Sequence, residues 1–423
     1  MNEAFLSYLW KSRQLSPDLC TESGDALVIL HPGEQNTDGG PDFFNARLRI
    51  GETVWAGNVE IHLRASHWFR HGHQFDHAYD NAILHVVYES DAPVYGPNGE
   101  PLQTLVVRDR FPLRIYDRYR EMMENRQWIP CFNQLSTTPG NGFNLWAPAL
   151  AVERLAGKSL AVKQQWERCR NDWEEALYLH LASTFGMKIN SLPFELLAKS
   201  LPLRIVRKHL DSLFQLEALY FGQSGLLENG FGGGYPADLL NEYQYLRKKY
   251  DLKPIPGSTW KFLRLRPVNF PTLRISQWAG FIYNGRLDLL DILECSSARE
   301  LAGALNAGAS PYWDTHYVFG KASPFRKKLL GKDAVYLLMI NGIVPFMFFH
   351  GLEKDQPVRR ETALNILEQI PGEQNAQVGM WETAGMPVVN ALQTQALIHL
   401  KKTYCDRKRC LDCRIGNFLL EKN

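Results

Sequence analysis

The sequence predicts a mixed α/β region at the N-terminus, followed by a mainly helical region that runs to the C-terminus. Residues 25–109 contain short apolar or alternating runs separated by turn formers, which is typical of strands. From about residue 113 the apolar residues recur at helical spacing instead, in one segment after another. With 423 residues and 45% hydrophobic content, the chain is long enough for two or three domains.

Composition narrows the class of protein. The N-terminus lacks a basic segment followed by an apolar one, and we find no apolar run near the roughly 18 residues that span a bilayer. We therefore expect a soluble, cytoplasmic protein with no membrane partner. The net charge of +2 gives no global field for a polyanion, so any nucleic-acid binding must depend on local basic patches.

The first elements are a helix and three strands. Residues 3–13 place apolar side chains at helical spacing, with Glu3 in the first turn. Apolar or alternating runs then predict strands at 25–31, 43–50 and 53–63. In the third strand we expect two faces, one with Trp55, Gly57, Val59, Ile61 and Leu63 and the other with Asn58, Glu60 and His62.

Acidic residues should meet where the second and third strands pair. Asp42 opens the second strand, and Glu60 lies on the same face of the third strand as His62. Antiparallel pairing through the turn at Gly51 would bring Asp42 next to Glu60. Neighbouring carboxylates repel each other, so we expect a divalent cation, Mg²⁺ or Mn²⁺, to bind them.

A histidine-rich segment follows. Ser66 is a plausible N-cap for a helix over 66–81, although Gly72 weakens its middle. Six of the twelve histidines lie between residues 62 and 85, and the pairs 67/71 and 73/77 have helical i,i+4 spacing. They could bind a metal, or hydrogen-bond to phosphates and neighbouring carboxylates. Strands at 82–89 and 102–109 then close a first domain over 1–115.

The second half is predicted to be helical. Residues 116–142 read as a connecting helix followed by a Thr-Pro-Gly-Asn-Gly linker at 138–142. Residues 143–423 contain successive helical patterns that end in a cysteine-rich tail. The glycine-rich segment 222–234 is expected to be a flexible loop.

Three cysteines in the tail form a metal-ligand signature. Cys405, Cys410 and Cys413 lie within nine residues, among Lys and Arg residues that should lower their pKa. Cys131 is the best candidate for a fourth ligand, because Cys169 and Cys295 lie in helical and apolar patterns. Such a site would hold the end of the chain against the first domain. Zn²⁺ and a [4Fe–4S] cluster fit these ligands equally well, and three free thiols are the alternative.

Basic and aromatic residues alternate between residues 260 and 278. Arg264, Arg266 and Arg274 surround an Asn-Phe-Pro loop, a composition suited to phosphate contact and base stacking. An ordinary loop whose arginines pair with acidic residues would look the same. The basic segment 321–332 would extend such a patch.

The order helix, three strands, helix and strand, with Asp42 opening the second strand and Glu60-Ile61-His62 in the third, resembles the core of the PD-(D/E)xK nuclease superfamily. The resemblance covers residues 1 to about 90 and implies a restriction-endonuclease-like α-β-β-β-α-β fold. It implies that Asp42 and Glu60 bind the metal, with Glu3 as a further acidic ligand. His62 stands where the superfamily has Lys, and His71 or His73 would contribute a polar group to the substrate site.

The whole chain also resembles a bacterial family that carries a domain-of-unknown-function label. The matching segments are GPDFFNA, AGNVEIH, LHVVYE, RLRPVNFPT and YCDRKRCLDCRIG. Together these observations predict a metal-dependent nuclease or phosphodiesterase acting on DNA or RNA. The alternatives are a non-catalytic nucleic-acid-binding or scaffold protein with a degenerate nuclease fold, and a hydrolase of a small phosphorylated molecule. The oligomeric state is not predicted.

Overall fold

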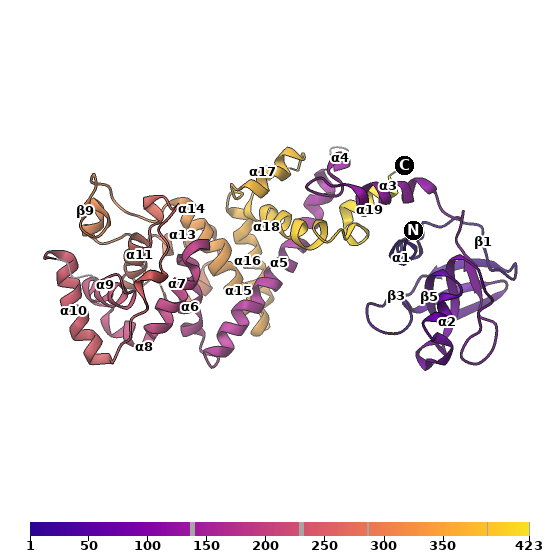
Figure 1. Ribbon diagram of the computed structural model, residues 1–423, viewed down its shortest axis with the longest axis horizontal. Coiled ribbons are helices and arrows are strands. Elements are labelled where there is room, and N and C mark those ends of the chain that lie inside the picture. Colours follow the sequence, from indigo (N-terminus) through magenta and orange to yellow (C-terminus); the bar gives the residue numbers. More distant parts are fainter. Residues whose placement is uncertain (136–139, 228–231, 286, 387, 423) are drawn as a thin grey trace. The chain divides into compact units, whose positions relative to one another are not determined.

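The protein is a mixed α/β chain that folds into two compact units. The computed structural model (Figure 1) describes residues 1–135, 140–227, 232–285, 287–386 and 388–422. One unit comprises residues 1–143 and 400–423, and the other comprises residues 144–399. This grouping differs from the sequence-based division, because the cysteine-rich tail packs with the N-terminal elements.

The first unit is organised around a mixed sheet. Its order is β1-β2-β4-β5-β6-β7, with β3 paired to β4. The pairs from β1 to β5 are antiparallel, whereas β6 is parallel to β5 and β7 is parallel to β6. The predicted strands are confirmed, and β1 and β3 are added to them. The bounds are β1 Leu19–Cys20, β2 Ala26–His31, β3 Glu34–Gln35, β4 Phe43–Ile50, β5 Thr53–Arg64, β6 Ala82–Glu89 and β7 Thr104–Val106.

A β-bulge shifts the register where β4 meets β5. Phe43 pairs with Val59, and the regular register resumes only at Ala46 opposite Gly57. Asn45 lies between them with φ of 56°, in the left-handed region. Phe43, next to this bulge, is fully buried.

The segment between β5 and β6 is not the single helix predicted for 66–81. It forms the short helix α2 (His67–Arg70) and two 3₁₀ turns, His73–Phe75 and His77–Tyr79. Gly72, at φ 77°, ends the helical path. This broken segment lies close to β5, whose Glu60 and His62 are buried like Val59 and Ile61 on the opposite face.

Helices complete the first unit. Helix α1 (Glu3–Lys11) is capped by the side chain of Asn2 and buries Phe5, Leu9 and Trp10. Helix α3 (Leu113–Glu124) packs on the C-terminal helix α19 (Arg414–Glu421). The remaining pieces are α4 (Phe132–Leu135), a π-helix (Leu400–Cys405) and a 3₁₀ turn (Cys410–Asp412).

The second unit is helical, as predicted, apart from the short hairpin β8–β9. Helix α5 begins at Gly140, inside the predicted linker, and residues 138 and 139 lie outside the described part of the chain. Within the predicted glycine-rich loop, α9 ends at Gln223 and residues 228–231 are likewise outside it. The α-helices and strands are α5 Gly140–Arg168, α6 Trp173–Phe185, α7 Met187–Ser200, α8 Leu203–Val206, α9 Leu213–Gln223, α10 Tyr235–Tyr250, α11 Pro271–Tyr283, α12 Leu289–Glu294, α13 Ala298–Ala304, β8 His316–Val318, β9 Lys321–Ala322, α14 Lys332–Leu338, α15 Val344–Glu353, α16 Pro357–Gln369, α17 Ala376–Thr383 and α18 Ala391–His399. Shorter 3₁₀ turns at Arg207–His209, Gly257–Thr259, Pro267–Asn269 and Pro311–Thr315 and a π-helix at Met339–Ile343 join them.

One helical stretch of the second unit is long and apolar enough to cross a membrane. It runs from Lys332 to Glu353 through α14, the π-helix and α15. The expectation that no run approaches this length was therefore wrong. Its most apolar part is 78% buried inside the unit, as in the core helix of a soluble protein.

Candidate metal centre

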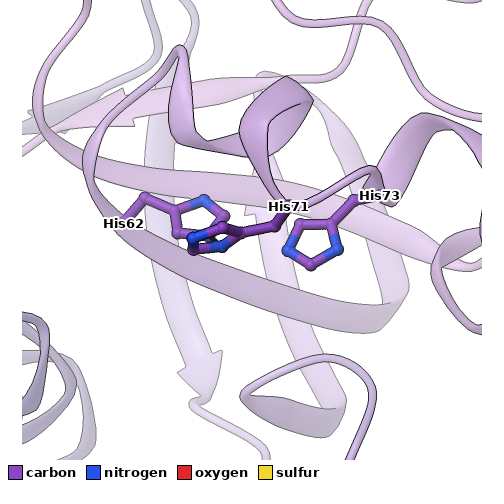
Figure 2. Close-up of side chains that lie close together, drawn as sticks. All are labelled: His62, His71 and His73. Atoms are coloured by element: carbon purple, nitrogen blue, oxygen red, sulfur yellow. Dashed lines mark hydrogen bonds between the residues drawn. The ribbon is translucent and has the colours of Figure 1, made fainter.

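Three histidines from two adjoining segments converge in the first unit. His62 comes from β5, His71 from the residue that ends α2, and His73 from the following 3₁₀ turn. One potential ligand atom from each lies within 4.8 Å of the other two. Figure 2 shows the imidazole of His71 overlapping that of His62, with the ring of His73 beside them. The left-handed Gly72 provides the chain reversal that brings His71 and His73 to the same place.

The two predicted carboxylates are neighbours. The backbone N–H of Asp42 donates to Oε2 of Glu60 at 3.1 Å, and Oδ2 of Asp42 accepts from the N–H of Ile61 at 3.0 Å. The predicted proximity of Asp42 and Glu60 is thus confirmed. Burial, followed by repulsion from Glu60, raises the pKa of Asp42 to about 7, and the hydrogen bond from Ile61 opposes this rise.

Glu60 links the carboxylates to the histidines. Its Oε1 lies 3.4 Å from Nε2 of His62 and 3.3 Å from Nε2 of His73. Although His73 is only 9% exposed, its Nε2 has no hydrogen-bond partner among the described residues. Its contact with Glu60 is therefore not a hydrogen bond, and a buried polar atom that makes no hydrogen bond costs folding free energy. A cation held between Glu60 and the imidazoles would satisfy it.

His62 is at the centre of the histidine cluster. Its Nε2 lies 3.1 Å from Nδ1 of His71, and its Nδ1 lies 2.9 Å from Nε2 of His85. Burial, followed by the neighbouring His85, lowers the pKa of His62 to about 2. The ring is therefore neutral at physiological pH, and it supplies none of the positive charge of the Lys that the nuclease resemblance places here.

Glu3 and His67 form a pair at the edge of the cluster. Oε1 of Glu3 accepts the N–H of Leu63 at 3.3 Å and lies 3.4 Å from Nδ1 of His67. Glu3 is outside the 4.8 Å group, although it is close enough to Asp42 to contribute to its raised pKa. His77 is separate, since its side chain is 95% exposed and pairs with Asp80.

A group of three imidazoles favours a different metal from the one that the carboxylates alone predict. Imidazole nitrogens suit Zn²⁺, Fe²⁺ and similar ions, whereas carboxylates suit Mg²⁺ and Mn²⁺. Sequence reasoning placed His71 and His73 in a substrate site and did not single out His85 as a site residue. The available signal was the concentration of histidines between residues 62 and 85.

Comparison with known proteins identifies the family. Residues 3–376 match a protein family described as "Protein of unknown function (DUF2851)". The chain belongs to this family. No curated protein and no solved structure matches the chain. The DUF2851 match includes every residue of the histidine cluster, Asp42, Glu60 and Cys131, but it ends before the three C-terminal cysteines.

The four cysteines of interest are gathered in the first unit, outside the DUF2851 match except for Cys131. Cys131, Cys410 and Cys413 are buried, and Cys405 is partly buried. Burial raises the pKa of Cys131 and of Cys410 to about 12, and neighbouring cysteines of this group add to the rise in both. Lys408 lowers the pKa of Cys410, as expected, but burial outweighs this effect and the net shift is upward.

The predicted basic residues lie within the DUF2851 match, in the second unit. Arg274 is 6% exposed, donates to Gln277 and Asn269, and has its pKa lowered to about 10 by burial. Arg266 and Arg274 line a common cavity and Arg264 does not, although Arg264 and Arg266 are both exposed. Of the three arginines predicted to form one basic patch, the structure therefore places two, Arg266 and Arg274, at the same cavity.

Proposed function

We propose that this protein is a metal-dependent phosphodiesterase that cleaves DNA or RNA at the centre formed by Asp42, Glu60, His62, His71 and His73. The observation that carries this proposal is the buried Nε2 of His73, which lies 3.3 Å from Oε1 of Glu60, beside a group of three imidazoles, and makes no hydrogen bond to any described residue. Such a donor set suits a divalent cation that activates water.

The topology supports the nuclease part of the proposal. Helix α1, the antiparallel strands β2, β4 and β5, the segment with α2, and the parallel strand β6 follow one another in the order implied by the PD-(D/E)xK resemblance. Asp42 precedes β4 and Glu60 lies in β5, at the positions of the superfamily's metal-binding acids. A restriction-endonuclease-like core is therefore part of the proposal.

The roles of the side chains follow from their environments. A bound Mn²⁺ or Zn²⁺ would polarise the phosphoryl oxygen and lower the pKa of the attacking water. His62, His71 and His73 would hold it through ring nitrogens, and Oε1 of Glu60, which lies near His62 and His73 but outside the 4.8 Å group, would be a further acidic ligand. Asp42, whose pKa is raised to about 7 in the metal-free protein, would lose its proton when the cation binds, and its free carboxylate would accept the proton of the water.

The competing proposal is a non-catalytic nucleic-acid-binding protein. It is favoured by the neutral His62 at the position of the Lys, because no fixed positive charge then stabilises the pentavalent phosphorus. Both proposals have nucleic acid as the partner and the cytoplasm as the location. They differ in whether the metal centre cleaves its ligand.

Cleavage assays distinguish the two. Labelled single-stranded DNA, double-stranded DNA and RNA would be incubated with Mn²⁺ or Zn²⁺ and either the parent protein or the Asp42→Asn/Glu60→Gln variant. His77→Ala is the matched control, since His77 is exposed outside the cluster. The enzyme proposal predicts cleavage by the parent and the control, with at least about a hundred-fold loss in the double variant. Equal cleavage by the double variant, or none by any protein, would contradict it.

We further propose that the cysteine group holds a [4Fe–4S] cluster. Tetrahedral Zn²⁺ with Zn–S bonds of about 2.3 Å brings its four sulfur atoms to within about 4 Å of one another. Among the described residues, however, no three of these sulfur atoms form a group within 4.8 Å of one another, as the three histidine nitrogens do. A [4Fe–4S] cluster binds each thiolate through a different iron, which requires this wider spacing.

The local backbone supports a metal-binding role for these cysteines. The N–H groups of Ile415 and Gly416 bond to the sulfur of Cys413, as suits a thiolate ligand. Anaerobic purification should give a brown protein with about four iron and four sulfide ions per chain. Cys131→Ser should lose them, and Cys169→Ser should keep them. Stoichiometric zinc without iron, or a metal-free protein, would contradict the cluster.

A further inference from the structure

The helical unit contains a cavity with a volume of about 1320 Å³. Its walls come from α5, α6 and α7, from the beginning of α11, and from the segment that leads into α14. All of these elements belong to the second unit, so the cavity is complete within it. Small-molecule sites usually enclose about 300–1,000 Å³, so this cavity has room for a larger ligand.

The lining of the cavity is strongly basic. Nine Lys or Arg residues line it, against two acidic residues, Glu195 and Asp333. Some of the basic groups are already engaged: Lys199 pairs with Glu195, and Lys327 pairs with Asp314. The chain as a whole has a net charge of only +2, so positive charge is concentrated here.

Four cationic side chains of the cavity make no ion pair with any residue that the structure describes. Arg168, Lys188, Arg266 and Arg326 line the cavity, and within the described part of the chain their side chains make no hydrogen bond or ion pair. Cations that face a common space repel one another. An anionic ligand with several negative charges would remove this repulsion.

Two further features of the wall favour an anion. Helix α11, which has 13 residues, begins at the cavity with Pro271, and no side chain caps its N-terminus. The partial positive charge of a helix N-terminus attracts negative groups. In the first turn of α11, Arg274 is almost completely buried and its Nε has no hydrogen-bond partner among the described residues.

We propose that this cavity binds the sugar-phosphate backbone of a single-stranded nucleic acid. Several cations distributed over a large cavity match a chain of phosphates better than a single one. Apolar side chains such as Leu265 and Val268 also line the space and offer surfaces for bases. The inference rests on the proposed nuclease function and names the site that would hold its substrate, separately from the metal centre.

Binding of the oligonucleotide to the protein is measured in EDTA, which removes divalent cations and so prevents metal-dependent cleavage. Fluorescence anisotropy of a labelled single-stranded oligonucleotide would be measured in EDTA with the full-length protein. The test variant is Lys188→Gln/Arg266→Gln/Arg326→Gln. The matched control is Lys248→Gln/Lys253→Gln/Arg299→Gln, which removes the same charge from exposed positions of the same unit outside the cavity.

The cavity variant should bind at least about ten-fold more weakly, and its slope of log affinity against log salt should fall by about two, at roughly 0.7 for each lost contact. The control should stay within about two-fold of the parent. Equal affinity of the cavity variant and the parent would overturn the proposal, as would an equal loss in the control. Binding of inorganic phosphate without binding of the oligonucleotide would also overturn it. Binding is measured in EDTA and does not depend on the metal centre. A protein that binds the oligonucleotide in EDTA but cleaves nothing in the assay with Mn²⁺ or Zn²⁺ would therefore refute the proposed enzyme and leave this inference standing.

Discussion

Nε2 of His62 and Nδ1 of His71 lie 3.1 Å apart, although the two residues come from different elements of the first unit. Two imidazole nitrogens at this distance either share a proton or bind the same ion. His62 has its pKa lowered to about 2, so its ring is neutral, and a proton between the two nitrogens would belong to an ordinary N–H···N hydrogen bond. Two nitrogen ligands that each lie about 2.0–2.1 Å from one metal are themselves roughly 3 Å apart. The 3.1 Å between these two nitrogens therefore suits a shared cation without rearrangement of the rings.

His85 should orient His62. Its Nε2 lies 2.9 Å from Nδ1 of His62, and His85 is completely buried. A histidine ligand that is held through its other nitrogen keeps one tautomer, and loss of such a partner typically weakens metal binding by about 10–100-fold. We therefore expect His85→Leu to weaken Mn²⁺ binding by that factor, and His85→Gln to restore part of the loss.

A purely structural role for His85 predicts something different. Thermal unfolding of His85→Leu and His85→Gln would be followed with and without metal. If His85 only fills space, Leu and Gln should change metal affinity in proportion to their loss of stability. A loss of affinity at unchanged stability, with rescue by Gln, is the expected result.

Metal affinity should depend on the pH through Asp42. The pKa of this carboxyl is raised to about 7, so in the metal-free protein it binds a proton below that pH. A cation must displace this proton, so affinity should rise up to about tenfold per pH unit as the pH approaches 7 and level off above it. Asp42→Asn should remove this dependence. Titration calorimetry at several pH values measures it, and an unchanged profile in the variant would exclude Asp42 from the site.

The same carboxyl affects the stability of the metal-free protein. Its folded pKa lies above the ordinary value of 3.8, so the folded state binds the proton more tightly than the unfolded state does. The resulting stabilisation is present at acid pH and is lost as the pH rises through about 7. Compared with Asp42→Asn, the parent should therefore lose stability from about pH 4, near the ordinary pKa of 3.8, to about pH 7, and level off above that pH in urea unfolding.

Sequence patterns predicted the sheet and most of the acidic site. Period-two alternation identifies β4 and β5, and their antiparallel pairing brings Asp42 to the part of β5 that contains Glu60. The bulge between Phe43 and Ala46, which the alternation did not predict, sets the exact register there. The secondary structure of residues 66–81 was not predictable in this way, because the i,i+4 spacing of the histidines favours a helix and the left-handed Gly72 breaks that helix. His71 and His73 meet because of that break. Their convergence on His62 depends on tertiary packing, which local periodicity does not report.

The helical unit offers a separate test of packing. A Cβ at Gly222 in α9 would overlap the ring of Tyr243 in α10, whereas one at Gly379 in α17 would meet nothing within 4 Å. Overpacking a core usually costs about 1–3 kcal/mol, and replacing an open helical glycine by alanine gains up to about 1 kcal/mol. Gly222→Ala should therefore lower the urea midpoint, and Gly379→Ala should leave it equal or higher. A stable Gly222→Ala protein would contradict the close packing of α9 on α10.

The most direct test of the metal centre is a titration with Mn²⁺, which thiolates bind poorly and the histidine–carboxylate group should bind. Electron paramagnetic resonance of free Mn²⁺ gives the affinity of the parent, His71→Ala and His77→Ala. His71 is exposed, so its removal should leave the fold intact, and His77 is the exposed histidine outside the group. We predict one Mn²⁺ per chain, a loss of affinity of at least about ten-fold in His71→Ala, and no change in His77→Ala. No binding by the parent, or equal affinity in His71→Ala, would contradict the account.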